Sequence, residues 1–209
     1  MILETFIVGP LQVNCYLIAD EKTLTGIIVD PGDEPDRIIE LTKDLKVNIQ
    51  YILCTHGHFD HIGAVGEIKD VFGAKIILHK EDLVVYQNSY KIALTWGLSA
   101  EEQPMPDLLI SEGEIIQLDG LMLNIINTPG HTPGSICAIG NGFILTGDTL
   151  FAGSIGRTDF PGGDYKKMGN SFRRLMSLDR NLKIFPGHGP FSTIGQELAT
   201  NPFVYEFKA

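Results

Sequence analysis

The sequence THGHFDHIG, residues 55–63, packs three histidines and one aspartate into six consecutive positions. The apolar segment 49–54 before it is typical of a buried strand, and the segment 64–72 after it has the pattern of a helix. The cluster is therefore expected on a loop between a strand and a helix. Ligands of α/β proteins bind at that edge of a sheet.

The four side chains of this loop point in two directions. Alternate residues of an extended chain face the same way, so His56 and His58 are expected side by side. Asp60 and His61 project differently, because they lie at the turn into the helix. This single loop can thus serve two adjacent metal ions.

Three further side chains of the same kinds follow expected strands. His131 lies between two Pro/Gly turns, Asp148 comes directly after the segment 143–147, and His188 follows the segment 182–185. Five of the six histidines occupy such loops, and the sixth, His79, ends a strand-like segment. This concentration predicts a metal site.

The ligand types indicate the metals. Imidazole nitrogen with carboxylate oxygen, and no thiolate, suits zinc, iron(II) or manganese. We expect two divalent metal ions, with zinc preferred and iron or manganese as alternatives. The expected ligands are His56, His58 and His131 for one ion, Asp60, His61 and His188 for the other, and Asp148 as a bridge.

Neither ligand group fills a metal's coordination shell, which is typical of catalytic rather than structural sites. Two cations strongly lower the pKa of a water bound between them, which makes it a hydroxide nucleophile near neutral pH. The catalytic residues predicted here are Asp60, which can orient the hydroxide, and Asp148. The chain contains no GxSxG or Walker A pattern that would indicate competing chemistry.

Composition limits the partners and the compartment. The formal net charge of −10 argues against a nucleic-acid partner, and no apolar run is long enough to span a membrane. The basic residues of the helix-like stretch 164–178 are expected to form a solvated face; these are Lys166, Lys167, Arg173 and Arg174. Three cysteines in apolar segments, Cys15, Cys54 and Cys137, predict buried free thiols and a cytoplasmic location.

The pattern along the chain predicts an α/β protein with one domain over residues 1–209. Strands are expected at 3–8, 13–19, 25–30, 49–54, 74–79, 114–119, 121–127, 135–140, 143–147 and 182–185, and helices at 34–45, 64–72 and 164–178. Helices interspersed among strands in both halves suggest two packed sheets flanked by helices, a four-layer αββα sandwich. The aromatic, helix-like stretch 81–109 is either a lid over the substrate or packing between layers. Asp30 either closes a turn or supports a ligating imidazole.

THGHFDHIG, followed in order by His131, Asp148 and His188, resembles the metallo-β-lactamase superfamily. The resemblance implies the αββα fold with a dinuclear site at one edge. Asp148 stands where zinc β-lactamases have cysteine, which argues against antibiotic hydrolysis. An intact His58 argues against the flavodiiron branch, which has glutamate there.

The segments GDTLFAGSIGRTDFPGGD (147–164) and PGHGPFSTIGQELATNPF (186–203) resemble short bacterial glyoxalase II-like enzymes, the hydroxyacylglutathione hydrolases. Those enzymes cleave thioesters such as S-D-lactoylglutathione. The chain ends soon after the second segment, so we expect no helical C-terminal glutathione-binding domain. The chain has Arg157, Thr158 and Asp159 where the long enzymes have a lysine and a tyrosine. Arg157 is expected to pair with a substrate carboxylate.

Two alternatives to a thioester hydrolase stay open. Persulfide dioxygenases resemble the chain in GRTDF and use a single iron, with ligands that correspond to His56, His131 and Asp148. Their last histidine lies in an AHDY-like context, whereas His188 lies in GHGP, which favours the hydrolase. A non-catalytic metal-binding scaffold is the third possibility, and the open coordination shells argue against it.

Overall fold

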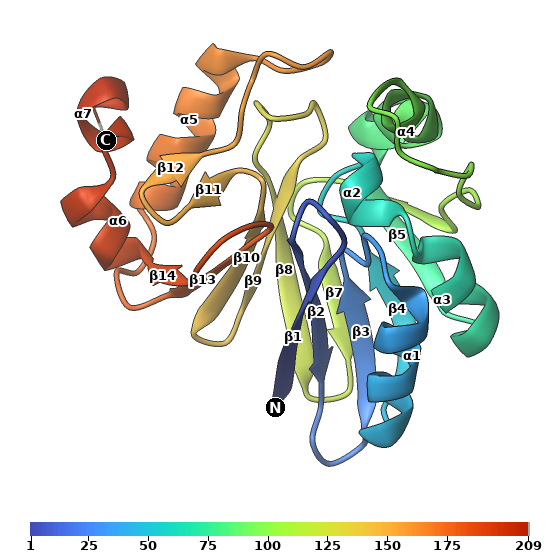
Figure 1. The fold of residues 1–209 in the computed structure, drawn as a ribbon. Helices are drawn as coiled ribbons and strands as arrows, with labels where there is room; N and C mark the ends of the chain where they lie inside the picture. Colours follow the sequence, from blue (N-terminus) through green and yellow to red (C-terminus); the bar gives the residue numbers. More distant parts are fainter. Residues whose placement is uncertain (209) are drawn as a thin grey trace.

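The computed structural model of the protein describes residues 1–208, and its centre is two six-stranded sheets packed face to face (Figure 1). The first sheet has the order β1 (Ile2–Val8), β2 (Val13–Ala19), β3 (Thr25–Val29), β4 (Asn48–Leu53), β5 (Lys75–His79) and β6 (Leu108–Ile110). The second has the order β14 (Ser192–Thr193), β13 (Lys183–Pro186), β10 (Phe143–Gly147), β9 (Ile136–Gly140), β8 (Leu121–Asn127) and β7 (Ile115–Leu118). Strands β11 (Leu150–Phe151) and β12 (Ser154–Ile155) form a separate hairpin.

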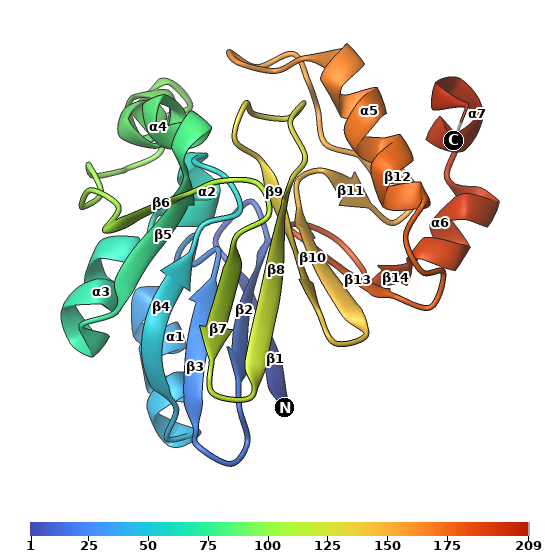
Figure 2. The ribbon, with the colours of Figure 1, turned by 180° about the vertical axis from the view of Figure 1, so that it is seen from behind.

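Helices cover the outer face of each sheet (Figures 1 and 2). On the first sheet these are α1 (Pro35–Asp44) and α3 (Val65–Phe72), and on the second α5 (Tyr165–Met176) and α6 (Ile194–Thr200). Helix α7 (Phe203–Phe207) packs against α5 and α6. The single turn α2 (Phe59–Ile62), the 3-10 turn η1 (Lys80–Asp82) and α4 (Leu83–Thr95) lie at one end of the sandwich. The predicted αββα arrangement is confirmed.

Strand β2 shows why these residues form a sandwich, because all seven of them are buried. Tyr16 and Ile18 belong to the core between the two sheets, whereas Cys15 and Leu17 belong to the core under α1 and α3. A strand that is buried on both faces has a nearly continuous apolar sequence, and the segment 13–19 is apolar except for Asn14.

Helix α5 covers the second sheet with one apolar face. The Asp164 side chain caps it by accepting a hydrogen bond from the Lys167 backbone N–H at 2.9 Å. Phe172 and Leu175 are fully buried against the sheet, and the four basic residues named above are exposed. The prediction of a solvated basic face is confirmed.

Strand direction brings the candidate site together. Strands β3, β4 and β5 run parallel, and β10 runs parallel to β13. The loops that follow these strands therefore open at one end of the sandwich. All three cysteines are buried and free, as predicted.

Several short elements were not expected from the sequence. One is α2, a single turn within the histidine-rich loop, and another is β6, a three-residue edge strand that ends the stretch 81–109. Segments this short carry too little periodicity to be recognised. Within residues 1–208, no helix is long and apolar enough to cross a membrane.

We predict that Leu175→Ala, which opens a cavity under α5, lowers the free energy of unfolding by about 2–5 kcal/mol. The matched control is Leu94→Ala on α4, whose side chain is 54% exposed, and we expect it to change stability by about 0.5 kcal/mol or less. Urea denaturation of both variants measures the difference. Equal losses would contradict the packing described for α5.

Candidate metal centre

The histidine-rich loop leaves the sheet as an extended chain and then turns. His58 has an extended backbone (φ −72°, ψ 148°), and α2 begins at the next residue. Asp60 and His61 lie on that helical turn, and the His61 ring returns to the His56 ring, with centroids 4.2 Å apart. The backbone turns between the two pairs as expected, but the His56 and His61 rings lie side by side rather than apart.

The first group of ligand-type side chains is His56, His58 and His131. One nitrogen of each lies within 4.8 Å of the others, and all three residues are buried. His131 Nε2 is 2.9 Å from His58 Nδ1. Burial, with a smaller contribution from neighbouring histidines, lowers the pKa of His58 to about 3 and that of His56 below its ordinary value. Both imidazoles are therefore neutral near pH 7, the form that binds metals.

The second group is Asp60, His61 and His188, whose ligand atoms also lie within 4.8 Å of one another. The Nε2 atoms of His61 and His188 are 3.2 Å apart, and His188 Nε2 is 3.4 Å from Asp60 Oδ2. Burial acts to raise the pKa of Asp60, but His61 and His188 outweigh it and hold the pKa below its usual value. Asp60 is thus a carboxylate at neutral pH.

Asp148 faces both groups. Its Oδ2 is 3.6 Å from His131 Nε2 in the first group and 3.6 Å from His188 Nε2 in the second, and its Oδ1 is 3.4 Å from His61 Nε2. Burial alone would raise the pKa of this carboxyl, but His61 and the other two histidines hold it well below its ordinary value. A single carboxylate therefore spans the space between the two groups.

Outer hydrogen bonds turn the ring nitrogens inward. The Nδ1–H of His61 donates to Asp30 Oδ2 at 3.0 Å. The Nδ1–H groups of His131 and His188 donate to the backbone oxygens of Arg157 (2.7 Å) and Leu11 (3.0 Å). Each bond leaves the Nε2 lone pair directed toward the cluster, as metal-ligating histidines require. Asp30 thus supports an imidazole, the second of its two expected roles.

The side chains fit a divalent cation. Within residues 1–208, two buried polar side-chain atoms have no hydrogen-bond partner, His56 Nε2 and Asp148 Oδ1, and both belong to the cluster. Buried polar groups are otherwise almost always paired. A positive ion satisfies both atoms together with the inward-facing lone pairs. The cluster is therefore suited to bind divalent metal.

The seven predicted ligands all lie in this cluster, and the ligand role of each stays a prediction. His79, at the end of β5, lies outside it and accepts a hydrogen bond from the Glu81 backbone N–H at 3.4 Å. Arg157 lies beside the cluster, but its guanidinium is exposed and pairs with Asp159 through two contacts of 2.7 Å. Its role in substrate binding also stays a prediction.

Asp82 is a residue that the sequence did not reveal. It is fully buried, and its carboxylate accepts hydrogen bonds from the backbone of both loops that supply the first group. The sequence does place Asp82 shortly after a strand, as it does Asp148. No other ligand-type motif around Asp82 distinguished it as a candidate.

The stretch 81–109 reaches the mouth of the site. Trp96, at the end of α4, contacts Phe59 and Phe160 edge-on, with ring centroids 5.8 and 6.0 Å apart. Phe160 in turn contacts His58 at 5.6 Å. The same stretch also packs through buried Tyr86, whose hydroxyl donates to the Pro104 oxygen at 2.7 Å. Its role as a lid stays a prediction.

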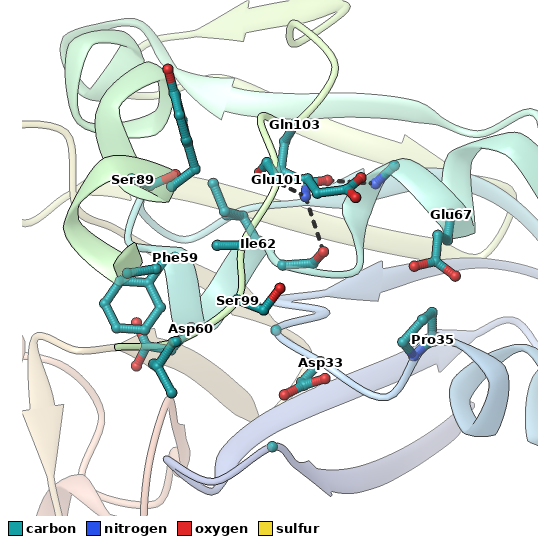
Figure 3. A pocket seen from close by; sticks show the side chains of 18 of the residues that line it. Asp33, Pro35, Phe59, Asp60, Ile62, Glu67, Ser89, Ser99, Glu101 and Gln103 are labelled. Atoms are coloured by element: carbon teal, nitrogen blue, oxygen red, sulfur yellow. Dashed lines mark hydrogen bonds between the residues drawn. The ribbon is translucent and has the colours of Figure 1, made fainter. Parts of the chain in front are cut away.

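A cavity of about 660 Å³ adjoins the cluster at Asp60 and extends along α2 and α3 (Figure 3). Gln103 closes it on one side by donating to the Gly63 oxygen (3.0 Å) and accepting from the Gly66 N–H (2.8 Å). Its lining within residues 1–208 includes no lysine or arginine. It does include the carboxylates of Asp33, Asp60, Glu67, Asp70, Glu101 and Glu102. This side of the centre is unfavourable for an anionic ligand.

Residues 8–188 match the family described as the Metallo-beta-lactamase superfamily. Hydroxyacylglutathione hydrolase GloC of Haemophilus influenzae is 41% identical over 214 residues, with 98% of both chains covered. The Bacillus subtilis protein YqgX, a probable metallo-hydrolase, is 33% identical over 206 residues, with 96% of both chains covered.

Solved structures share the fold along the whole chain. TTHA1623 in a di-iron-bound form has a TM-score of 0.89 at 37% identity, covering 96% of this chain and 99% of that one. The BLEG-1 B3 metallo-beta-lactamase also has a TM-score of 0.89, at 31% identity, with 97% and 99% covered. ETHE1 from Myxococcus xanthus has a TM-score of 0.84 at 24% identity, with 100% and 90% covered, a likeness that concerns the fold alone.

If the cluster binds metal, we expect zinc to raise the Tm of the protein strongly. Zinc at a free concentration about 1,000 times its Kd stabilises a folded protein by about 4 kcal/mol, which raises Tm by about 8–16 °C for a domain of this size. We expect this rise when chelator-treated protein is titrated with zinc in a calorimeter. His79→Gln should show the same rise, because that side chain lies outside the cluster. A Tm that zinc leaves unchanged would contradict the assignment.

Proposed function

This chain belongs to the metallo-beta-lactamase superfamily, and on that basis we propose that it is a dinuclear metal-dependent hydrolase of thioesters such as S-D-lactoylglutathione. The observation that carries the proposal is the position of Asp148, whose carboxylate faces both ligand groups. The similarity to a hydroxyacylglutathione hydrolase over the full chain supports the choice of substrate class.

We assign one ion to His56, His58 and His131, the other to Asp60, His61 and His188, and the bridge to Asp148. Zinc is the preferred metal, and iron or manganese also suits these ligands. Two such cations supply a nucleophile from water near neutral pH and positive charge for the oxyanion of the tetrahedral intermediate.

Asp60 has a position suited to water activation. Its side chain is 17% exposed, lines the cavity and is ionised at neutral pH. A carboxylate there can accept a hydrogen bond from the attacking water and hold its lone pair toward the thioester carbonyl. The products are the carboxylic acid and the free thiol.

Two aromatic side chains can bury the reacting bond. Phe160 contacts His58 of the first ligand group, and Trp96, from the other half of the chain, contacts Phe160. Apolar groups at the mouth exclude bulk water, and electrostatic interactions are stronger where water is excluded.

Arg157 is the cation that we propose for a substrate carboxylate. Its guanidinium lies 3.9 Å from the centroid of the Phe160 ring, on the side of the centre where Phe160 contacts His58. The cavity beyond Asp60 carries only carboxylates among its charged lining. An anionic thiol portion such as glutathione is therefore better placed beside Arg157.

The three buried free thiols support a reducing compartment, for which we propose the cytoplasm. A small-molecule thioester is the proposed partner. The formal net charge of −10 makes nucleic acid an unfavourable one.

Asp148→Ala should abolish thioester hydrolysis. Loss of the carboxylate that faces both groups removes several kcal/mol of transition-state stabilisation, which corresponds to about 10³-fold in kcat/KM. Release of free thiol from S-D-lactoylglutathione measures the reaction. The matched control is Asp36→Ala, an exposed carboxylate on α1. Turnover near that of the wild type in Asp148→Ala would contradict the bridging role.

Two further assays on the same protein distinguish a thioesterase from the alternative activities. Oxygen consumption with glutathione persulfide, together with a single iron per chain, would favour the dioxygenase that the ETHE1-like fold leaves possible. Hydrolysis of a β-lactam faster than of the thioester would favour the activity in the name of the BLEG-1 enzyme. Either result would overturn the thioesterase proposal.

Arg157→Gln should raise KM for S-D-lactoylglutathione while leaving kcat unchanged. The guanidinium is exposed and already paired with Asp159, so we expect a rise of only about two- to fivefold. A thioester without a carboxylate should show no such rise, and Arg180→Gln serves as an exposed control. Equal KM values for Arg157→Gln and the wild type would remove Arg157 from the substrate site.

A further inference from the structure

Asp82 is a buried carboxylate to which the proposed chemistry assigns no part. It lies in η1, directly before α4, and its side chain is fully buried. Its Oδ2 accepts a hydrogen bond from the Gly57 backbone N–H at 2.7 Å, and its Oδ1 accepts one from the Gly134 N–H at 2.6 Å. Both carboxylate oxygens are therefore occupied by backbone donors.

The two donors belong to the loops that carry the first ligand group. Gly57 lies between His56 and His58, and Gly134 follows His131 by three residues. One side chain thus holds together two loops that are more than 70 residues apart in the sequence. Because Gly57 lies between two of the histidines and Gly134 lies in the loop of the third, a shift of Asp82 would displace the backbone that carries these imidazoles.

Close packing leaves these loops little freedom. A Cβ added to Gly57 would lie 2.6 Å from the Tyr86 backbone nitrogen, and one added to Gly134 would lie 2.5 Å from the Asp82 nitrogen. Real Cβ atoms do not approach backbone that closely. Both glycines therefore sit against the start of the η1–α4 segment, and the Asp82 carboxylate sets the distance between the loops.

We propose that Asp82 is a positioning residue for the His56, His58 and His131 metal site. The inference rests on the proposed metal centre but not on the identity of the substrate. The arrangement requires a carboxylate, because both oxygens must accept a hydrogen bond. An asparagine offers one accepting oxygen, and its NH₂ group would face an N–H donor of one loop.

Asp30 provides a comparison, because it is a second buried carboxylate that supports a histidine of the cluster. Its Oδ1 accepts from the Thr55 N–H at 2.7 Å, and its Oδ2 accepts from the Thr55 hydroxyl at 2.7 Å and from His61 Nδ1–H at 3.0 Å. Asp30 thus holds His61 of the second group directly and also reaches the first group, because the Thr55 hydroxyl lies 3.2 Å from His56 Nδ1. Asp82 contacts the loops of the first group alone.

The test uses Asp82→Asn, Asp30→Asn and the control Glu81→Gln, which makes the same charge change at an exposed neighbour of Asp82. Competition between each protein and a chelator for cobalt(II) measures the two affinities. NMR signals of the histidine N–H protons, shifted by the bound cobalt, identify the occupied group. We expect Asp82→Asn to weaken binding at the first group by about 10–100-fold and to leave the second within about twofold. Asp30→Asn should weaken binding at the second group, where Asp30 bonds to His61, and also at the first, which it reaches through Thr55.

Affinities in Asp82→Asn that match those of Glu81→Gln at both groups would overturn the inference and leave the proposed hydrolase intact. A wild-type protein that binds no cobalt would overturn the metal centre itself, and this inference with it. The two failures are therefore distinguishable without an activity assay.

A measurement on the wild type applies even if Asp82→Asn does not fold. Coupling between two sites is reciprocal, so a metal that depends on Asp82 must in turn stabilise the Gly57 and Gly134 hydrogen bonds. We expect zinc to slow amide hydrogen exchange at both glycines by about 5–150-fold. Exchange rates that zinc leaves unchanged would overturn the proposal.

Discussion

The convergence of inward-facing lone pairs at one end of the sandwich is the constraint on which the rest of the site depends. Imidazole nitrogens of His61 and His188 lie 3.2 Å apart, and the Asp148 carboxylate lies between the two groups. Positive charge must balance imidazoles and carboxylates held at such distances. Burial acts to lower the pKa of His61 and His188, but the neighbouring carboxylates outweigh it and raise both, so protons supply that charge when no metal ion is bound. The outer hydrogen bonds, the short helix α2 and the buried Asp82 all serve to keep this arrangement in place.

The fold supplies that convergence through strand direction. Parallel pairing of β3 with β4, and of β10 with β13, sends the loops that bear Asp30, His56, Asp148 and His188 to the same end. The two cores hold these strands rigidly, because β2 is buried on both faces and α5 seals the second sheet. Metal sites built on rigid elements keep their geometry, whereas the substrate side is formed by the longer segments around Trp96 and Phe160.

The layers of the fold and the residues of the candidate metal centre could be predicted from the sequence. The αββα layers follow from long apolar strands such as 13–19, and the cluster follows from residue types that rarely occur together outside metal sites. Asp82 could not be predicted, because its function lies in contacts with Gly57 and Gly134, which tertiary structure alone brings near. The pairing of Arg157 with Asp159 was also hidden, since a basic residue close to an acidic one in sequence does not reveal whether the two side chains meet. The helical part of 81–109 was recognisable, but its contact with Phe160 depends on how the two halves pack.

In the proposed centre, the Asp148 carboxylate joins two metal sites. Anomalous diffraction from crystals of the zinc-loaded protein, measured on both sides of the zinc absorption edge, tests this arrangement. We expect two peaks, one among His56, His58 and His131 and one among Asp60, His61 and His188, with Asp148 between them. A single peak bounded by His56, His131 and Asp148, with none near His61 and His188, would contradict it.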